Sequence, residues 1–225
     1  MRRWLVVGIL SLIALPGVAQ GNDELVLYDV DFGTPPHTVG LPPVVGGGPP
    51  PREKISDIRF GLPIVVADLG PLVDQPLKFE YGDQIALDLD DLPTYDSYTL
   101  ECDLMVVSVQ GRFSIFFDAP TIRRISFRPD GTVDIYPWDI VIGSYDFNEI
   151  VNLRVDVNLV ADTWTIFLDG LLVHDGTFNP ATQINTVRFS SLYGGLVGLD
   201  NIVIATMVPV EREDTSWTQV KNLYR

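Results

Sequence analysis

The most constraining feature of the sequence is a series of short stretches, from Leu25 to Ala205, in which apolar and polar residues alternate. Gly, Pro, Asn and Asp interrupt these stretches, and no stretch keeps a helical period. Alternation with a period of two is typical of strands that bury one face. The clearest strands are predicted at 24–33, 58–67, 77–89, 98–109, 112–118, 122–128, 132–136, 152–159, 163–169, 171–174, 184–191 and 199–206. Twelve strands are too many for one open sheet, so the sequence predicts an all-β fold of two packed sheets.

One turn fixes the register of two neighbouring strands. With Pro129-Asp130-Gly131 as a three-residue loop, apolar residues pair on one face and polar residues on the other, whereas a two-residue loop would mix the faces. The apolar pairs are then Phe127 with Val133 and Ile125 with Ile135, and the other face carries the pairs Arg128–Thr132, Ser126–Asp134 and Arg124–Tyr136.

A second turn is predicted at Asp169-Gly170, a dipeptide typical of the two-residue type I′ hairpin. It joins 164–168 to 171–174 and sets Ile166 opposite Val173 and Phe167 opposite Leu172. Both faces of this hairpin are apolar, so we expect both to be covered.

The N-terminus has the pattern of a secretory signal peptide. Arg2 and Arg3 precede an apolar run of twelve residues, and Gly17-Val18-Ala19 supplies small residues at the −3 and −1 positions of a cut before Gln20. The run is too short for a transmembrane helix. We therefore expect residues 1–19 to be removed and the remaining chain to be secreted, either extracellular or periplasmic, with no membrane insertion.

The net charge limits the classes of partner expected for the exported chain, and the pattern around the single cysteine predicts its burial. Removal of residues 1–19 takes two of 15 basic residues and none of 30 acidic ones, so the exported chain carries 13 minus 30, or −17. Nucleic acid and anionic membranes are therefore poor partners. The single cysteine, Cys102, lies at an apolar position of an alternating run and is predicted to be a buried hydrophobe.

The expected domain comprises residues 20–208, and two segments depart from its strand pattern. Residues 35–51 contain seven Pro and four Gly and cannot pair inside a sheet; this segment is either a crossover over the sandwich or a semi-rigid loop near a ligand, and we favour the crossover. The polar tail 209–225 places Trp217, Val220 and Tyr224 at helical spacing and predicts a short helix.

Several motifs of the second half resemble a known superfamily. They are Asn152-Leu-Arg-Val-Asp-Val, Asp162-Thr-Trp-Thr-Ile-Phe-Leu-Asp-Gly170, Asn185-Thr-Val-Arg-Phe and Leu199-Asp-Asn-Ile-Val-Ile204. Together they resemble the end of a concanavalin A-like lectin/glucanase domain, close to the laminin-G-like branch. The resemblance covers residues 98–206 well and 24–97 only by element order. It implies an antiparallel jelly-roll sandwich and leaves activity open, because lectins, hydrolases and lyases share this fold.

The catalytic motifs of that superfamily are incomplete in this chain. Its glucanases carry Glu-x-Asp-x-x-Glu, because one carboxylate attacks and another protonates the leaving oxygen. Here Glu101 and Asp103 match, but Val106 stands where the third carboxylate is due. The only histidines, His37 and His174, have no evident nucleophile beside them. We therefore predict no catalytic residue.

The candidate carbohydrate-binding residues are aromatic side chains in or beside loops, together with one arginine. Aromatic rings stack on the apolar faces of sugars, and planar polar groups bond their hydroxyls. The candidates are Arg124, Tyr136, Trp138 and Tyr193, with Tyr145 as a further aromatic. The same aromatics would also suit the rim of a sandwich core.

A structural calcium ion is the one cofactor considered, and none is required. If the first and last strands lie side by side, Asp29 or Asp31 comes near Asp200 and Asn201, and oxygen ligands suit calcium. The cluster Asp88, Asp90 and Asp91 is a second option. Alternatively, these residues keep the protein soluble or cap strands by side-chain hydrogen bonds.

Three functions remain open from the sequence. The leading hypothesis is a secreted, non-catalytic lectin-like module that binds an extracellular polysaccharide, another glycan or a cell-surface protein. The second is a diverged polysaccharide hydrolase or lyase of the same fold. The third is a structural or adhesive protein without a sugar ligand, whose C-terminal tail contacts a partner.

Overall fold

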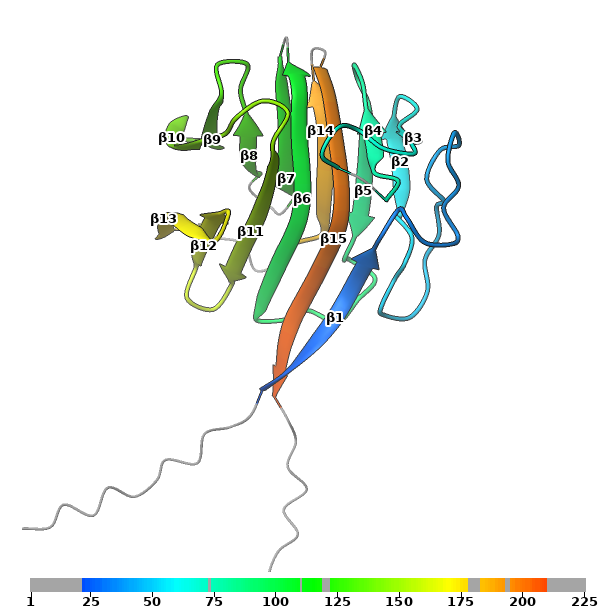
Figure 1. Ribbon diagram of the computed structural model, residues 1–225. Helices are drawn as coiled ribbons and strands as arrows, with labels where there is room; N and C mark the ends of the chain where they lie inside the picture. Colours follow the sequence, from blue (N-terminus) through cyan, green and yellow to red (C-terminus); the bar gives the residue numbers. More distant parts are fainter. Residues whose placement is uncertain are drawn as a thin grey trace, which may run out of the picture. The chain divides into compact units, whose positions relative to one another are not determined.

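The protein is a sandwich of two antiparallel β-sheets (Figure 1). The structure is a computed structural model that describes residues 22–72, 74–109, 111–118, 122–177, 183–192 and 195–209. Glu24–Val208 forms one compact unit, and the fold described below is that of this unit. The described residues contain only strands and connecting segments. The all-β, two-sheet prediction is therefore confirmed.

The fifteen strands in the described part of the chain are distributed over two sheets, one of eight strands and one of seven. The order in the eight-stranded sheet is β13-β12-β11-β6-β15-β4-β3, with β1 also pairing β15, and the order in the seven-stranded sheet is β10-β9-β8-β7-β14-β5-β2. The first sheet contains β1 (Asn22–Val30), β3 (Ile64–Val65), β4 (Leu77–Phe79), β6 (Ser97–Val109), β11 (Ile150–Asn158), β12 (Thr163–Leu168), β13 (Leu171–Thr177) and β15 (Gly195–Pro209). The second contains β2 (Asp57–Phe60), β5 (Gln84–Asp88), β7 (Arg112–Asp118), β8 (Arg123–Phe127), β9 (Thr132–Tyr136), β10 (Ile140–Ser144) and β14 (Thr186–Leu192).

Two predicted strands are wrong because the chain changes sheet within each. The stretch 58–67 divides into β2 and β3, and 77–89 divides into β4 and β5. Asp83, which is 5% exposed, lies between these corners and accepts hydrogen bonds from the Leu62 and Glu80 amides at 2.8 and 2.6 Å. Gly61 turns with φ of 70° directly beside the Asp83 carboxylate, where a Cβ atom would have no space. β10 is a further strand that the alternation did not predict.

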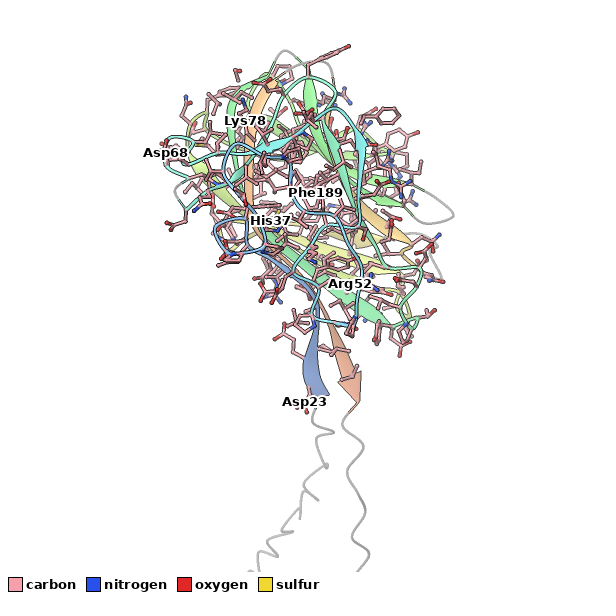
Figure 2. The ribbon with its side chains drawn as sticks, turned by 90° about the vertical axis from the view of Figure 1, so that its right-hand side faces the viewer. Asp23, His37, Arg52, Asp68, Lys78 and Phe189 are labelled. Atoms are coloured by element: carbon pink, nitrogen blue, oxygen red, sulfur yellow. The ribbon has the colours of Figure 1, made fainter. Side chains whose placement is uncertain are left out.

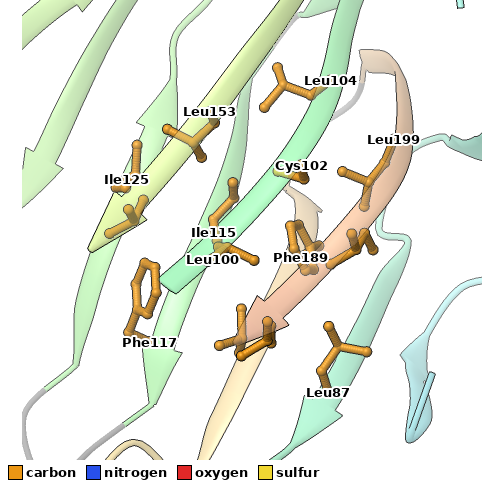
Figure 3. Close-up of a cluster of buried hydrophobic side chains, with 14 of the residues drawn as sticks. Leu87, Leu100, Cys102, Leu104, Ile115, Phe117, Ile125, Leu153, Phe189 and Leu199 are labelled. Atoms are coloured by element: carbon orange, nitrogen blue, oxygen red, sulfur yellow. The ribbon is translucent and has the colours of Figure 1, made fainter. Parts of the chain in front are cut away.

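The core lies between the two sheets and is built from the inward residues of each strand (Figure 3). Cys102 projects from β6 between Leu100 and Leu104 toward Ile115 and Phe189 of the opposite sheet. It is 1% exposed and forms no disulfide, and burial raises the pKa of its thiol. The prediction of a buried strand cysteine is confirmed.

The β8–β9 hairpin has the predicted three-residue loop. Ile125 pairs with Ile135, Phe127 with Val133 and Ser126 with Asp134. The Gly131 amide donates to the Arg128 carbonyl at 3.1 Å, with a φ of 79° that glycine adopts without strain. This register matters for the site, because it places Arg124 directly opposite Tyr136 on the outward side.

The β12–β13 hairpin differs from its prediction in part. Asp169 and Gly170 both have positive φ angles, 50° and 75°, as a type I′ turn requires, and Phe167 pairs with Leu172. However, an irregularity after Ile166 sets this residue opposite His174 rather than Val173. The expectation of cover on both sides is wrong, because β13 is an edge strand on which Leu172 is 58% exposed.

The Pro/Gly-rich segment packs on the sandwich through the buried Arg52 (Figure 2). The Arg52 guanidinium donates to the Tyr28 hydroxyl at 2.9 Å, to the Asp88 carbonyl at 3.1 Å and to Asp91 at 2.7 Å. His37, 7% exposed, accepts from the Val44 amide at Nδ1 and therefore donates from Nε2 to a backbone carbonyl. Burial lowers its pKa. Both side chains serve to hold this segment in place.

Some predictions lie outside the described residues. These are the signal peptide 1–19, the helix in the tail beyond Pro209, and the candidate ligand residue Tyr193. Within the described ranges, no helix is long and apolar enough to cross a membrane.

Candidate functional site

The outward side of the seven-stranded sheet carries four arginines among serines and aromatic rings. We call this surface the arginine face. Because side chains alternate along a strand, every second residue of β7, β8, β9 and β14 contributes to it. Its members are Arg112, Ser114, Phe116 and Asp118 of β7, Arg124 and Ser126 of β8 with Arg128 after it, Asp134 and Tyr136 of β9, and Arg188 and Ser190 of β14.

A polar row crosses the arginine face at one register and is almost completely buried. It comprises Gln84, Ser190, Ser114, Ser126 and Asp134, paired across β5, β14, β7, β8 and β9. None of the five is more than 5% exposed, and the Ser114 and Ser126 hydroxyls are hydrogen-bonded at 3.2 Å. Outward polar residues usually meet water, so longer side chains of the face must cover this row.

The next register holds alternating guanidinium groups and aromatic rings. Arg188 pairs with Phe116, Phe116 with Arg124, and Arg124 with Tyr136. The Arg188 guanidinium lies 4.4 Å from the Phe116 ring centre, and that of Arg124 lies 4.9 Å from the Tyr136 ring centre. Both distances are within the range of cation–π contacts. The row therefore presents planar apolar and planar donor surfaces side by side.

Three arginines of the face surround two aspartates. Arg128 forms a close ion pair with the buried Asp134, and Arg112 lies 4.0 Å from the same carboxylate. The Asp139 carboxylate lies 3.9, 3.9 and 3.8 Å from Arg112, Arg124 and Arg128, in that order. Burial and, to a lesser extent, the neighbouring Arg112 charge lower the pKa of Arg124. The cluster thus has one positive charge in excess.

Several buried polar atoms of the face have no hydrogen-bond partner among the described residues. They are Arg124 Nε, Arg188 Nε, Ser190 Oγ and Asp134 Oδ1. Buried polar atoms in native proteins are nearly always paired. Because these four atoms are buried, a ligand would reach them only if neighbouring side chains moved.

A hollow of about 370 Å³ continues the arginine face toward β2. Arg188, Asp118 and Gln84 line it together with Phe60, Ile122 and Arg59. From β2 to β9 the face crosses six strands, or roughly 24 Å at about 4.8 Å per step. This length suits an extended polymer better than a single small molecule.

The structure brings together two of the four carbohydrate-binding candidates, and a third follows them along the chain. Arg124 and Tyr136 stack on the arginine face, and Trp138, 43% exposed, lies after them with the Arg123 guanidinium 5.1 Å from its ring centre. Tyr145 instead belongs to the core, where its hydroxyl donates to the Arg128 carbonyl at 2.5 Å.

Sequence reasoning missed the other members of the face. The signal was present in part, since the hairpin register already placed Ser126, Arg128 and Asp134 beside Arg124. Arg112, Phe116 and Arg188 alternate in the same way on β7 and β14. Their meeting with β8 depends on the strand order β8-β7-β14-β5, which the sequence alone did not provide.

The candidate calcium residues do come near one another, because β1 pairs β15. Burial raises the pKa of Asp200 to about 6, and the charges of Asp31 and Asp103 add to this effect. Asn201 donates its side-chain amide to Asp103 at 2.8 Å, and Asp31 accepts from the Gly33 amide at 2.7 Å. In the described part of the chain, no three His, Cys, Asp or Glu residues are grouped to hold a metal ion. The calcium site stays a prediction.

The residues that partly match the glucanase motif lie on the other sheet. Glu101 is 3.5 Å from Arg154, and Asp103 accepts hydrogen bonds from the amides of Asn152 and Asn201. Glu101 and Arg154 line an open groove of about 720 Å³ on that outer surface. Both carboxylates are therefore engaged with neighbouring polar side chains.

The comparisons with known proteins concern the fold. The sequence matches no family model and no curated protein. Among solved structures, the cellulose induced protein Cip1 superposes with a TM-score of 0.56 at 11% identity, covering 78% of this chain and 95% of that one. The carbohydrate binding module CBM66 from Bacillus subtilis gives a TM-score of 0.47 at 14% identity, covering 67% and 94%.

Another match covers only a small part of the other chain. A chain described as a sialidase matches with a TM-score of 0.49 at 12% identity over 61% of this chain, but this chain spans only 15% of that protein. The described residues thus have a two-sheet antiparallel jelly-roll sandwich, which is the fold that the sequence motifs predicted.

Proposed function

We propose that the protein is a secreted carbohydrate-binding module that takes an extracellular polysaccharide on the arginine face. The observation that carries the proposal is the row Arg188, Phe116, Arg124 and Tyr136, in which donors and rings alternate across four strands. Sugars present both apolar ring faces and hydroxyl groups, so a surface that alternates aromatic rings with planar donors matches both.

The rigidity of the face supports binding with little reorganisation. Apart from Arg128, its residues project from strands of a sheet rather than from loops, and the row beside them is buried. A preformed site loses less conformational entropy on binding than a mobile one. Export of the chain, expected from the signal peptide, would bring this face to extracellular glycans.

A binding assay with a product readout tests the proposal. The chain from Gln20 to Arg225 is mixed with a panel of neutral and acidic polysaccharides, and the same wells are assayed for retained protein and for released reducing ends. The expected result is retention without product, and retention that falls at least tenfold in Tyr136→Ala.

Three outcomes would contradict the proposal. Leu172→Ala removes an apolar side chain that is 58% exposed, against 41% for Tyr136, from the edge strand of the other sheet, so an equal loss with this variant would place binding elsewhere. Release of product would favour the hydrolase or lyase hypothesis. Absence of retention across the panel would reject a glycan-binding function.

A further inference from the structure

We propose that the natural ligand of the arginine face is a polysaccharide that carries carboxylates, and that Asp139 occupies the carboxylate position until the ligand displaces it. This inference rests on the proposed function and narrows its ligand to uronate-containing polymers. The observations that lead to it are the position of one oxygen atom and the charge around it.

Asp139 Oδ1 is surrounded by three guanidinium groups but bonds to none of them. It lies 3.8 to 3.9 Å from nitrogen atoms of Arg112, Arg124 and Arg128. Hydrogen bonds between a guanidinium and a carboxylate are about 2.7 to 2.9 Å long, so the oxygen is about 1 Å too far away. The arrangement is that of an anion site held by a carboxylate that does not fit it.

The position of Asp139 in the chain explains why its carboxylate comes near the three arginines but does not reach hydrogen-bond distance. It lies in the connection between β9 and β10, with a φ of 49°, and its side chain is 56% exposed. The backbone therefore limits how close the Asp139 carboxylate comes to the arginines. Because the side chain is exposed, it is still able to move away from them into solvent. A ligand carboxylate has no such tether and is able to move into bidentate contact.

The charge count favours an incoming anion. Arg112, Arg124 and Arg128 face Asp134, which is fully buried behind them, and Asp139, which is exposed. When Asp139 moves into solvent, the three guanidinium groups retain one carboxylate and have two positive charges in excess. A ligand carboxylate restores the balance. The many acids elsewhere on the chain act weakly here, because salt screens exposed charges beyond about 8 Å at physiological ionic strength.

The neighbouring aromatic rings select a sugar acid over a simple anion. Tyr136, 41% exposed, stacks on Arg124 and is therefore adjacent to the anion position. A uronate combines a carboxylate with an apolar ring face in one residue. It would thus contact the arginines and Tyr136 at the same time, which acetate or phosphate would not.

The test compares polymers that differ only in their carboxylates. Polygalacturonate, alginate and hyaluronan are each paired with a carboxyl-reduced preparation, and dissociation constants are measured for the chain 20–225 and its variants. Asp139→Asn is expected to bind the acidic polymers about tenfold more tightly, because the internal competitor loses its charge while asparagine still tolerates a positive φ. Arg112→Gln is expected to bind them about tenfold more weakly.

Control variants separate local from overall charge. Asp68→Asn removes the same charge as Asp139→Asn from an exposed residue between β3 and β4, and Arg154→Gln matches Arg112→Gln on the other sheet. Both controls are expected to change the dissociation constants less than twofold. Circular dichroism and melting curves verify that each variant is folded.

The outcomes distinguish this inference from the function on which it rests. Preference for the acidic polymers together with tighter binding by Asp139→Asn supports the inference. Equal binding of acidic and reduced polymers, or unchanged binding by Asp139→Asn, overturns it and leaves the carbohydrate-binding function standing. No binding to any polymer of either kind overturns both.

Discussion

Replacement of Asp134 by asparagine should lower stability and raise affinity for acidic polymers at the same time. Asp134 is fully buried on β9, and its carboxylate pairs with Arg128 and lies 4.0 Å from Arg112. Asparagine has nearly the same shape, so the variant removes the negative charge without creating a cavity. What remains is a set of arginines without their buried counterion.

The size of the stability loss follows from the burial of the partners. Loss of one member of a buried ion pair costs about 3 to 5 kcal/mol. The Arg128 side chain is 23% exposed and the Arg112 side chain 37%, so both keep contact with water and the cost is lower. We expect a loss of about 2 to 3 kcal/mol, which for a domain of this size lowers the Tm by roughly 4 to 12 °C.

Two measurements on the same samples check this prediction. Urea unfolding monitored by tryptophan fluorescence gives the stability change, and titration with polygalacturonate at low and high salt gives the affinity change. Removal of the charge increases the positive excess of the face, so affinity should rise at low salt and the gain should shrink at high salt. A variant as stable as the native protein, or one that binds the acidic polymer more weakly, would refute the reasoning.

Three further predictions concern residues outside the arginine face. Asp200→Asn should raise the free energy of unfolding by about 2 to 3 kcal/mol at pH 7 in the presence of a chelator, and by little at pH 4. The reason is that a carboxyl pKa raised to about 6 makes the native protein less stable as the pH rises from about 4 to 6. Urea unfolding across this range measures the change, and an equal change at both pH values contradicts the prediction. If Asp200 binds calcium, added calcium should stabilise only the native protein. Arg52→Met should lower the free energy of unfolding by about 3 kcal/mol and make residues 35–51 accessible to proteases. Limited proteolysis measures this accessibility, and unchanged cleavage would argue against the anchoring role of Arg52. Cys102 should react with thiol reagents only at the rate of unfolding, and fast labelling of the native protein would disprove its burial.

The fold could be predicted to the level of strand pairing where local patterns were decisive. The Pro129-Asp130-Gly131 loop and the Asp169-Gly170 turn specify their hairpins through short-range geometry alone. Alternation does not reveal a change of sheet, because a corner such as that at Gly61 leaves the apolar pattern of the flanking residues intact. The prediction of a single strand over 77–89 was wrong for the same reason, because β4 and β5 belong to different sheets.

The candidate site was predicted only as far as one hairpin extends. Arg124 and Tyr136 are opposite one another in a pairing that the sequence specifies, so their contact could be expected. Phe116 and Arg188 join them through the long-range neighbours β7 and β14. The burial of Asp134 also depends on side chains from these strands, and an isolated hairpin would leave this residue exposed.

NMR of the arginine side chains tests the central claim most directly. The Nε–Hε signals of Arg112, Arg124 and Arg128 are followed while the chain 20–225 is titrated with a galacturonate oligosaccharide, and Arg154 of the other sheet serves as an internal reference. The account predicts that the three signals shift together at the same ligand concentrations while the Arg154 signal stays in place. Shifts confined to Arg154, or no shift of the three signals up to saturating ligand, would contradict it.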